Sequence, residues 1–177
     1  MAFNPDSILK VQPIPTLSDE VNQIRLDTAD IVGKRIIPNE ALLARRFEDT
    51  DAQNLWNDIV GEVRERNLWA PHLPEEYGGS NLGFISHAYM NEILAWAAGA
   101  APMFGVVAPN SGNQKVLVRY GTPEQKKKWL EPLVRGETQS CFSMTEPDNA
   151  GSDPRSIQTR AVRDGDEWVI TRSEEHT

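Results

Sequence analysis

Apolar residues recur every three or four positions through much of this chain, which is the period of a helix with one buried face. The first such stripe follows a proline-containing start, residues 1–15, that we expect to be an arm or loop. Thr16, with Asp19 three residues later, is expected to cap this helix, and Pro38 is expected to end it. The stripe consists of Leu17, Val21, Ile24, Thr28, Ile31 and Val32.

Two further helices are predicted on either side of a loop rich in proline and glycine, residues 71–80. Thr50 and Gln53 match a capping box, which predicts a helix over residues 51–66. Asn81 is expected to cap a largely buried helix over residues 82–98. Its apolar side chains are Phe84, Ile85, Tyr89, Met90, Ile93, Leu94 and Ala97.

Residues 100–108 are apolar all round, so we expect a central, poorly solvated helix that Pro109 kinks or restarts and that finishes on Gly121. The next helix carries the clearest boundary signals, with Thr122 as cap, Pro123 in the first position and Gly136 as stop. Gln125 completes its capping box. Its inner face is predicted to be Trp129, Leu130, Leu133 and Val134, and its solvated outer face Lys126, Lys127 and Lys128.

After Gly136 the period of the apolar pattern changes from that of a helix to that of a strand. Residues 140–145 and 167–170 are predicted strands, residues 147–154 a turn-rich loop, and Asp164-Gly165 a hairpin turn after alternating residues. A hairpin of this size is only marginally stable alone. The predicted fold is therefore mainly α, an N-terminal all-α helical domain followed by the first strands of a truncated antiparallel β-domain. We expect boundaries at 1–137, 138–171 and a non-native tail, 172–177.

Composition and charge narrow the function classes. With 39% hydrophobic and 25% charged residues, the chain has the composition of a globular protein without a membrane span. Its 18 basic and 26 acidic residues give a net charge of −8, which disfavours nucleic-acid binding. The N-terminus has no basic segment of a secretory signal, so we expect a cytoplasmic protein. Cys141, the single cysteine, is expected to be a small buried residue and not a metal ligand.

Common catalytic signatures are missing from the sequence, which contains no P-loop, G-x-G-x-x-G, G-x-S-x-G or H-E-x-x-H pattern. The histidines do not cluster along the chain: His72 lies in a loop, His87 on a helix and His176 in the tail, so we interpret them as ordinary side chains. The segment 141–153 runs from a predicted strand into a turn with hydroxyl groups. Backbone N–H groups and hydroxyls at such a place can hold a flavin edge and a pyrophosphate, although a plain turn explains the spacing equally well.

Three motifs in this sequence resemble those of the acyl-CoA dehydrogenases. Thr145-Glu146-Pro147 followed by Ala150-Gly151-Ser152-Asp153 resembles the flavin signature T-E-P…G-S-D of that family. The segments P-E-E-Y-G-G at 74–79 and G-T-P-E-Q-K at 121–126 are similar to two of its helix-domain motifs. The motifs occur in the family's order, and the resemblance covers residues from about 17 to 170. Asn149 departs from the small apolar residue common there, and the loop is one residue longer than in the commonest version.

The resemblance implies an N-terminal helical domain, a middle β-domain and a C-terminal four-helix bundle, with FAD held between the last two. It implies that Phe142, Ser143, Met144 and Thr145 line the flavin ring, with Thr145 bonding its pyrimidine edge. Gly151 and Ser152 would lie near the FAD pyrophosphate, and Ser152 also near the pantetheine arm of the acyl-CoA substrate. These are the site residues that we predict.

The activity implied by the resemblance is α,β-dehydrogenation of acyl-CoA thioesters. In that family a carboxylate removes the α-proton, a hydride passes to the flavin, and the electrons leave to an electron-transferring flavoprotein. The carboxylate lies in the C-terminal domain, so no residue here is assigned a catalytic role and Glu146 is placed within the flavin loop. We expect this chain to be inactive alone, and the full-length protein to be a dimer or tetramer. The last six residues resemble a translated sequencing-adapter DNA.

Two alternatives stay open at this point. The same fold carries acyl-CoA oxidases, nitroalkane oxidases and flavin-dependent monooxygenases, and fold alone does not separate them. A different class of protein, a non-catalytic helical interaction module, would use the Gly/Pro loops only as connections between helices. Flavin absorbance distinguishes that module from all of the flavoenzymes.

Overall fold

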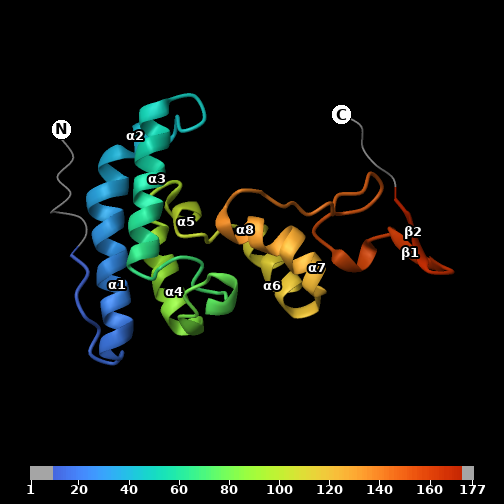
Figure 1. Cartoon of the computed structure of the whole chain (residues 1–177), viewed down its shortest axis with the longest axis horizontal. Helices are drawn as coiled ribbons and strands as arrows, with labels where there is room; N and C mark the ends of the chain where they lie inside the picture. Colours follow the sequence, from blue (N-terminus) through green and yellow to red (C-terminus); the bar gives the residue numbers. More distant parts are fainter. Residues whose placement is uncertain (1–9, 173–177) are drawn as a thin grey trace. The chain divides into compact units, whose positions relative to one another are not determined.

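The computed structural model describes residues 10–172, which divide after Ser140 into a helical unit and a second unit that we call the loop–hairpin unit (Figure 1). The helical unit contains α1 Asp19–Ile31, α2 Glu40–Leu43, α3 Thr50–Glu65, α4 Gly83–Leu94, α5 Ala100–Met103, α6 Asn110–Tyr120, α7 Pro123–Gln125 and α8 Glu131–Arg135. It also has π-helical turns at Val32–Ile36 and Lys126–Leu130 and 3-10 turns at Ile37–Asn39 and Glu75–Tyr77. The loop–hairpin unit has a 3-10 turn at Pro154–Ser156 and strands β1 Arg160–Asp164 and β2 Glu167–Thr171. This order confirms the predicted fold class.

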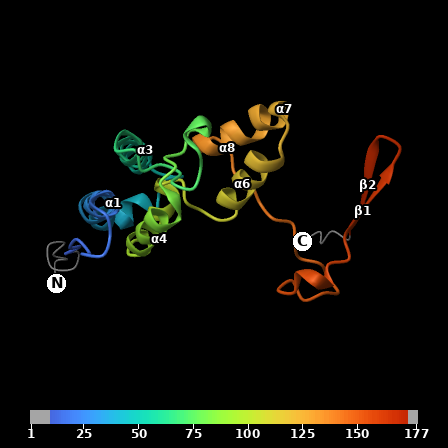
Figure 2. The same ribbon diagram turned by 90° about the horizontal axis from the view of Figure 1, so that it is seen from below.

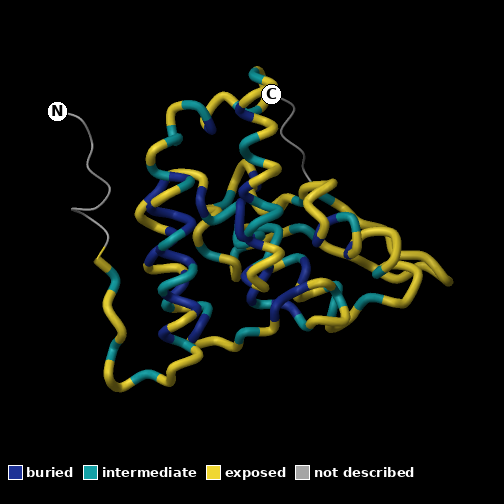
Figure 3. Tube along the Cα trace, turned by 60° about the vertical axis from the view of Figure 1, so that its left-hand side comes forward, coloured by how far each residue is buried: buried dark blue, intermediate teal, exposed yellow. Residues whose placement is uncertain are grey.

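The core of the helical unit lies between α1, α3, α4 and α5. Helix α1 packs against α4, and α3 against α5, and side chains from all four helices form one apolar cluster. Figure 2 shows α1, α3 and α4 side by side. Ile31, Ile59 and Phe104 are fully buried within it, and burying a side chain of this size contributes about 1.5–3 kcal/mol. Buried positions accordingly run along the inner sides of these helices in Figure 3. A smaller cluster joins the Pro/Gly loop to the π-turn and α8 through Ala70, Leu73, Leu130 and Val134.

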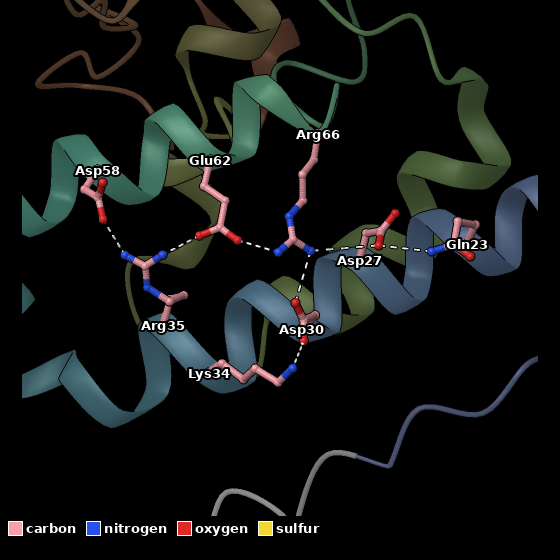
Figure 4. A network of polar contacts seen from close by, with 8 residues as sticks. All are labelled: Gln23, Asp27, Asp30, Lys34, Arg35, Asp58, Glu62 and Arg66. Atoms are coloured by element: carbon pink, nitrogen blue, oxygen red, sulfur yellow. Dashed lines mark hydrogen bonds and ion pairs between the residues drawn. The ribbon is translucent and has the colours of Figure 1, made fainter.

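A network of charged side chains links α1 and its π-helical extension to α3 (Figure 4). The carboxylate of Glu62 on α3 accepts bonds from both Arg35 and Arg66. Arg66 also pairs with Asp30 at 3.1 Å, and Asp30 pairs with Lys34. These pairs are partly exposed, so they favour one alignment of the two helices more than they add stability.

Three of the predicted helix caps are wrong, two of them because a neighbouring side chain makes the capping bond. Ser18, not Thr16, caps α1, since its hydroxyl accepts from the N–H of Val21. Asp49, not Thr50, caps α3, and its carboxylate accepts from two backbone N–H groups. A carboxylate also interacts favourably with the positive end of the helix dipole. Asn81 makes no capping bond and instead adopts a left-handed conformation, with φ of 49°.

The predicted burial of the middle helices is only partly correct. In α4, Met90, Ile93 and Leu94 are buried, but Phe84 is 82% exposed and the helix ends at Leu94 instead of Ala98. Of the helix predicted from residue 100 to Gly121, the restart after Pro109 and the end at Gly121 are confirmed, but residues 100–108 do not form a continuous helix. Only the four residues of α5 are helical, and α6 restarts after Pro109 with Gln114 as its one buried residue. An apolar composition does not by itself determine which positions face the core.

The boundaries predicted for the helix after Gly121 are confirmed. The capping box between Thr122 and Gln125 is present, and Gly136 ends α8 in the left-handed conformation that favours glycine. Trp129, predicted to face inward, is 56% exposed, so that part of the inner face is wrong. Lys126 also differs from the predicted outer face, because its amine donates to the hydroxyl of Tyr77 at 2.9 Å.

In the loop–hairpin unit, β1 and β2 pair in antiparallel register from Arg160↔Thr171 to Asp164↔Glu167. The hairpin predicted at Asp164-Gly165 is therefore confirmed. The strand predicted over residues 140–145 is not formed among the described residues, because the backbone N–H of Ser140 bonds to the side chain of Asn110 instead of a neighbouring strand. Cys141 is exposed and not buried as predicted. Within residues 10–172, no helix has the length and apolar character needed to cross a bilayer.

Candidate functional site

The predicted cofactor residues all lie in one exposed segment of the loop–hairpin unit, residues 142–152, which we call the candidate flavin loop. Phe142 is 57% exposed, and Met144 is also an exposed apolar side chain. Ser143, Thr145, Gly151 and Ser152 are exposed as well. The structure therefore keeps these residues together in space along one short segment, and their individual roles toward a cofactor stay predictions.

Glu146 lies at the centre of this segment and is only 5% exposed. One carboxylate oxygen accepts from the amide of Asn149 at 2.7 Å and from the N–H of Gln158 at 2.8 Å. The other oxygen accepts from the N–H and the hydroxyl of Thr159, at 2.8 and 2.5 Å. A single side chain thus connects the start of the candidate flavin loop to the residues that lead into β1.

These hydrogen bonds determine the protonation state of Glu146. The hydroxyl of Thr159 and the backbone N–H groups of Gln158 and Thr159 stabilise the carboxylate and lower its pKa to about 2. A carboxylate with so low a pKa is a weak base at neutral pH. This property agrees with a place in the loop framework and not with proton abstraction from a substrate.

The far end of the candidate flavin loop is held by a second group of local bonds. Asp153 accepts from the backbone N–H of Arg155 and forms an ion pair with its guanidinium at 2.9 Å. The hydroxyl of Ser156 donates to the carbonyl oxygen of Asp153 at 2.7 Å. Short-range bonds of this kind form a compact turn without an apolar core.

Arg172 supports the first residues of the segment. Its guanidinium donates to the carbonyl oxygens of Ser143 and Thr145, at 2.6 and 2.8 Å. The sequence had assigned Arg172 to the tail 172–177; the remainder of that tail, with His176, lies outside the described residues. The carbonyl groups of Ser143 and Thr145 are thus occupied, while their hydroxyls stay on the exposed surface.

The donors in the candidate flavin loop fit the groups that FAD presents. Within the part of the chain that the structure describes, the backbone N–H groups of Gly151 and Ser152 and the hydroxyls of Thr145 and Ser152 have no hydrogen-bond partner in the protein. A Cβ atom added to Gly151 would meet no other atom within 4 Å, so the backbone there is open to a large group. Unpaired N–H groups on an open turn suit a phosphate, and an exposed apolar edge suits a ring system.

The histidines differ from the sequence-based interpretation, which treated them as separate. The rings of His72, from the Pro/Gly loop, and His87, from α4, stack with centroids 5.7 Å apart. His72 also lies 2.8 Å from the side-chain oxygen of Gln114 on α6. Burial is the largest cause that lowers the pKa of both rings, and the charge of Lys115 lowers it further. No spacing in the sequence indicated this pair, because tertiary packing brings its members together.

Neither this pair nor the other described side chains form a metal site, since no three His, Cys, Asp or Glu residues of the described chain come close enough to hold an ion. The bonds that Glu146 accepts from Asn149, Gln158 and Thr159 are the part of the candidate site that the sequence did not predict. The acid in the middle of T-E-P was one available signal, because a charged side chain is seldom fully buried unless it is paired with hydrogen-bond donors.

Comparison with known proteins shows the family of this chain. The family model for the acyl-CoA dehydrogenase N-terminal domain matches residues 18–137. The chain belongs to the acyl-CoA dehydrogenase family. It is 44% identical to human acyl-CoA dehydrogenase family member 11 over 155 residues, 84% of this chain and 20% of that protein. Acyl-CoA dehydrogenase FadE12 of Mycobacterium tuberculosis is 39% identical over 127 residues, 72% of this chain and 30% of FadE12.

A solved structure from Mycobacterium abscessus, assigned to the acyl-CoA dehydrogenases, superimposes with a TM-score of 0.73 at 34% identity. The match covers 88% of this chain and 41% of that one. The chain therefore spans well under half the length of these acyl-CoA dehydrogenases. The family resemblance seen in the three sequence motifs is confirmed by these matches.

Proposed function

We propose that this chain is the N-terminal part of an FAD-dependent acyl-CoA dehydrogenase, an oxidoreductase that forms a double bond between the α and β carbons of acyl-CoA thioesters. The observation that carries the proposal is the candidate flavin loop, where Phe142 and Met144 are exposed beside donors that have no protein partner among the described residues. Membership of the family supports FAD as the group that meets these donors.

Each predicted site residue has a defined task in this proposal. Bound FAD would supply a hydride acceptor for the β-carbon of the substrate. Phe142, Ser143, Met144 and Thr145 would line the flavin ring, and Thr145 with adjacent backbone groups would bond its pyrimidine edge. The N–H groups of Gly151 and Ser152 bind the pyrophosphate, and the hydroxyl of Ser152 also reaches the pantetheine arm of the substrate.

The remaining predictions concern the whole enzyme. We assign residues 1–137 to the helical domain, 138–171 to the start of the β-domain and 172–177 to a non-native tail. The structural division after Ser140 supports the first boundary. The matched region is only 20% and 30% of these two relatives, so the catalytic base is expected in a part of the enzyme outside this chain, and the isolated chain is expected to be inactive.

The partners that we propose are acyl-CoA, an electron-transferring flavoprotein and further copies of the full-length protein, in a dimer or tetramer located in the cytoplasm. Exposed apolar side chains on the helical unit, among them Phe84, Val116 and Trp129, support association with other surfaces. Separated apolar residues on a surface do not identify the partner, so each assembly needs its own measurement.

The product of the complete gene provides the test. We expect it to purify yellow, to be bleached by an acyl-CoA thioester in the absence of oxygen, and to pass electrons to an electron-transferring flavoprotein. Rapid consumption of oxygen would indicate an oxidase or monooxygenase instead. A colourless protein that binds no added FAD would contradict the proposal and favour the helical interaction module. Turnover of acyl-CoA by the 177-residue chain would contradict the expected position of the base.

A further inference from the structure

We propose that Glu146 is a positioning residue, whose carboxylate forms the candidate flavin loop before any cofactor binds and so fixes the direction of the donors on Gly151 and Ser152. The inference rests on the proposed function, because it gives Glu146 a role toward FAD. It goes beyond the assignment of contact residues, since Glu146 itself points into the loop and away from solvent, at 5% exposure.

The carboxylate of Glu146 holds two chain segments closed, one short and one long. The bond from Asn149 closes a turn of three residues, and the bonds from Gln158 and Thr159 join positions 12 and 13 residues apart. Gly151 and Ser152 lie between these two closures. Their backbone directions therefore depend on a carboxylate that is not expected to touch the cofactor.

The partners of Glu146 explain why a carboxylate is needed here. The four bonds come from neutral donors, and within residues 10–172 no cation forms an ion pair with Glu146. An ionised carboxylate accepts all four bonds with its two oxygens, whereas a glutamine amide would place N–H donors where acceptors are required. The change from Glu to Gln therefore preserves size but breaks the bonding pattern.

A loop that is already formed binds a ligand more tightly than one that must become ordered, because binding then loses less conformational entropy. Apolar packing does not order this loop, since Glu146 is the only buried residue among the described positions 141–172. The loop is thus ordered by polar bonds, and the buried carboxylate is the group that joins its start to the residues leading into β1, while Asp153, Ser156 and Arg172 hold its two ends.

The first experiment uses the chain itself, without flavin, and follows the backbone amide signals of Gln158 and Thr159 by NMR. In the unmodified chain we expect both signals to be shifted by their bonds to the carboxylate and to move together only when the pH falls well below 4.5, the ordinary value for glutamate. Glu146→Gln should abolish the shifts and the titration. Asp148→Asn, an equal charge change at an exposed neighbour, should preserve both. Unshifted signals in the unmodified chain would overturn the inference.

The second experiment measures FAD affinity of the complete gene product by flavin fluorescence and the visible spectrum of the bound flavin. Glu146→Gln should weaken FAD binding by at least about tenfold, the loss typical when the support of a binding group is removed. Thr159→Val should weaken it as well, and Thr159→Ser, which keeps the hydroxyl, should restore affinity and spectrum. Helix signals of the unmodified and variant proteins, compared by circular dichroism, report whether the helical unit stays folded.

The two experiments separate the inference from the proposed function. If the unmodified full-length protein binds no FAD, the function is wrong, and the amide signals still decide whether Glu146 forms the loop. If the unmodified protein binds FAD and Glu146→Gln binds it equally well, the positioning role is wrong while the function stands.

Discussion

Helices α1, α3 and α4 enclose side chains such as Ile31 and Ile59 that have no exposed surface, whereas the only buried residue among positions 141–172 is the carboxylate Glu146. Every residue of β1 and β2 is exposed. The helical unit is therefore stabilised by apolar burial, and the loop–hairpin unit by hydrogen bonds over short stretches of chain. The difference shows that one chain can combine a region with its own core and a region whose order depends on polar bonds.

The largest expected effect comes from removing apolar volume in the helical unit. Phe104→Ala should lower the free energy of unfolding by about 4 kcal/mol, because Phe104 is fully buried and the change leaves a cavity. Urea unfolding followed by tryptophan fluorescence measures this loss. The comparison variant in the hairpin, Val162→Ala, should change the free energy of unfolding by less than about 0.5 kcal/mol, since Val162 is exposed. Equal losses in both variants would remove the distinction between the units.

A second test concerns the paired glycines of the Pro/Gly loop. A Cβ atom on Gly79 would lie 2.3 Å from the carbonyl oxygen of Leu73, so Gly79→Ala must displace backbone and should cost about 3 kcal/mol. At Gly78 the nearest atom is 3.6 Å away, and Gly78→Ala should cost only about 1–2 kcal/mol for its left-handed conformation, φ of 82°. Thermal unfolding ranks the two variants, and a smaller loss at Gly79 would contradict the close packing.

The carboxylates of Glu62 and Glu146 provide a smaller contrast, because both accept several bonds but only Glu62 has charged partners. Glu62→Gln should lower the free energy of unfolding by about 1 kcal/mol at low salt, and by less near 1 M salt, where exposed ion pairs are screened. The amide signals that report on Glu146 should be insensitive to the same salt. A salt-independent loss at Glu62 would show that its ion pairs with Arg35 and Arg66 do not stabilise α1 against α3.

The smallest effects are expected from pH, in two separate windows. Burial lowers the pKa of His72 and His87, so the unfolded chain binds protons more readily, and the stability of the helical unit should fall as the pH drops below 6.5. The pKa of Glu146 is lowered to about 2, so its contribution is complete above 4.5 and is lost as the pH falls toward 2. His87→Gln should reduce the loss of stability below pH 6.5 and leave the loss below pH 4.5 unchanged. The measurement is the urea midpoint as a function of pH, and an unchanged profile would exclude His87 as the titrating group.

The sequence-based predictions were most accurate for features that depend on residues close together in the sequence. The capping box of Thr122 and Gln125 and the stop at Gly136 were correct, because residues within a few positions decide them. The caps at Ser18 and Asp49 were missed by one or two residues, since several nearby side chains can accept the same N–H groups. Trp129 and Cys141 were expected to be buried but are exposed, because apolar character alone does not specify contact with the core.

The candidate site shows the same difference between features set by neighbouring residues and features set by tertiary contacts. The motif T-E-P…G-S-D placed the predicted cofactor residues on one segment without any structure, because they are neighbours in the chain. The closure of that segment by Glu146 and Thr159 was beyond the sequence pattern, since it joins residues 13 positions apart through one side chain. The stacking of His72 on His87 was likewise missed.

The sequence by itself determined the family, the order of helices before strands, and the chain segment that carries the candidate cofactor donors. It did so because periodicity, caps and short motifs are local properties that survive without knowledge of packing. The three-dimensional packing was needed to show which apolar faces are covered, which titratable groups meet, and that the carboxylate of Glu146 is buried and bonded within the loop. Those outcomes depend on contacts between segments far apart in the chain, where burial and hydrogen bonding change the properties of a side chain that its position in the sequence leaves open.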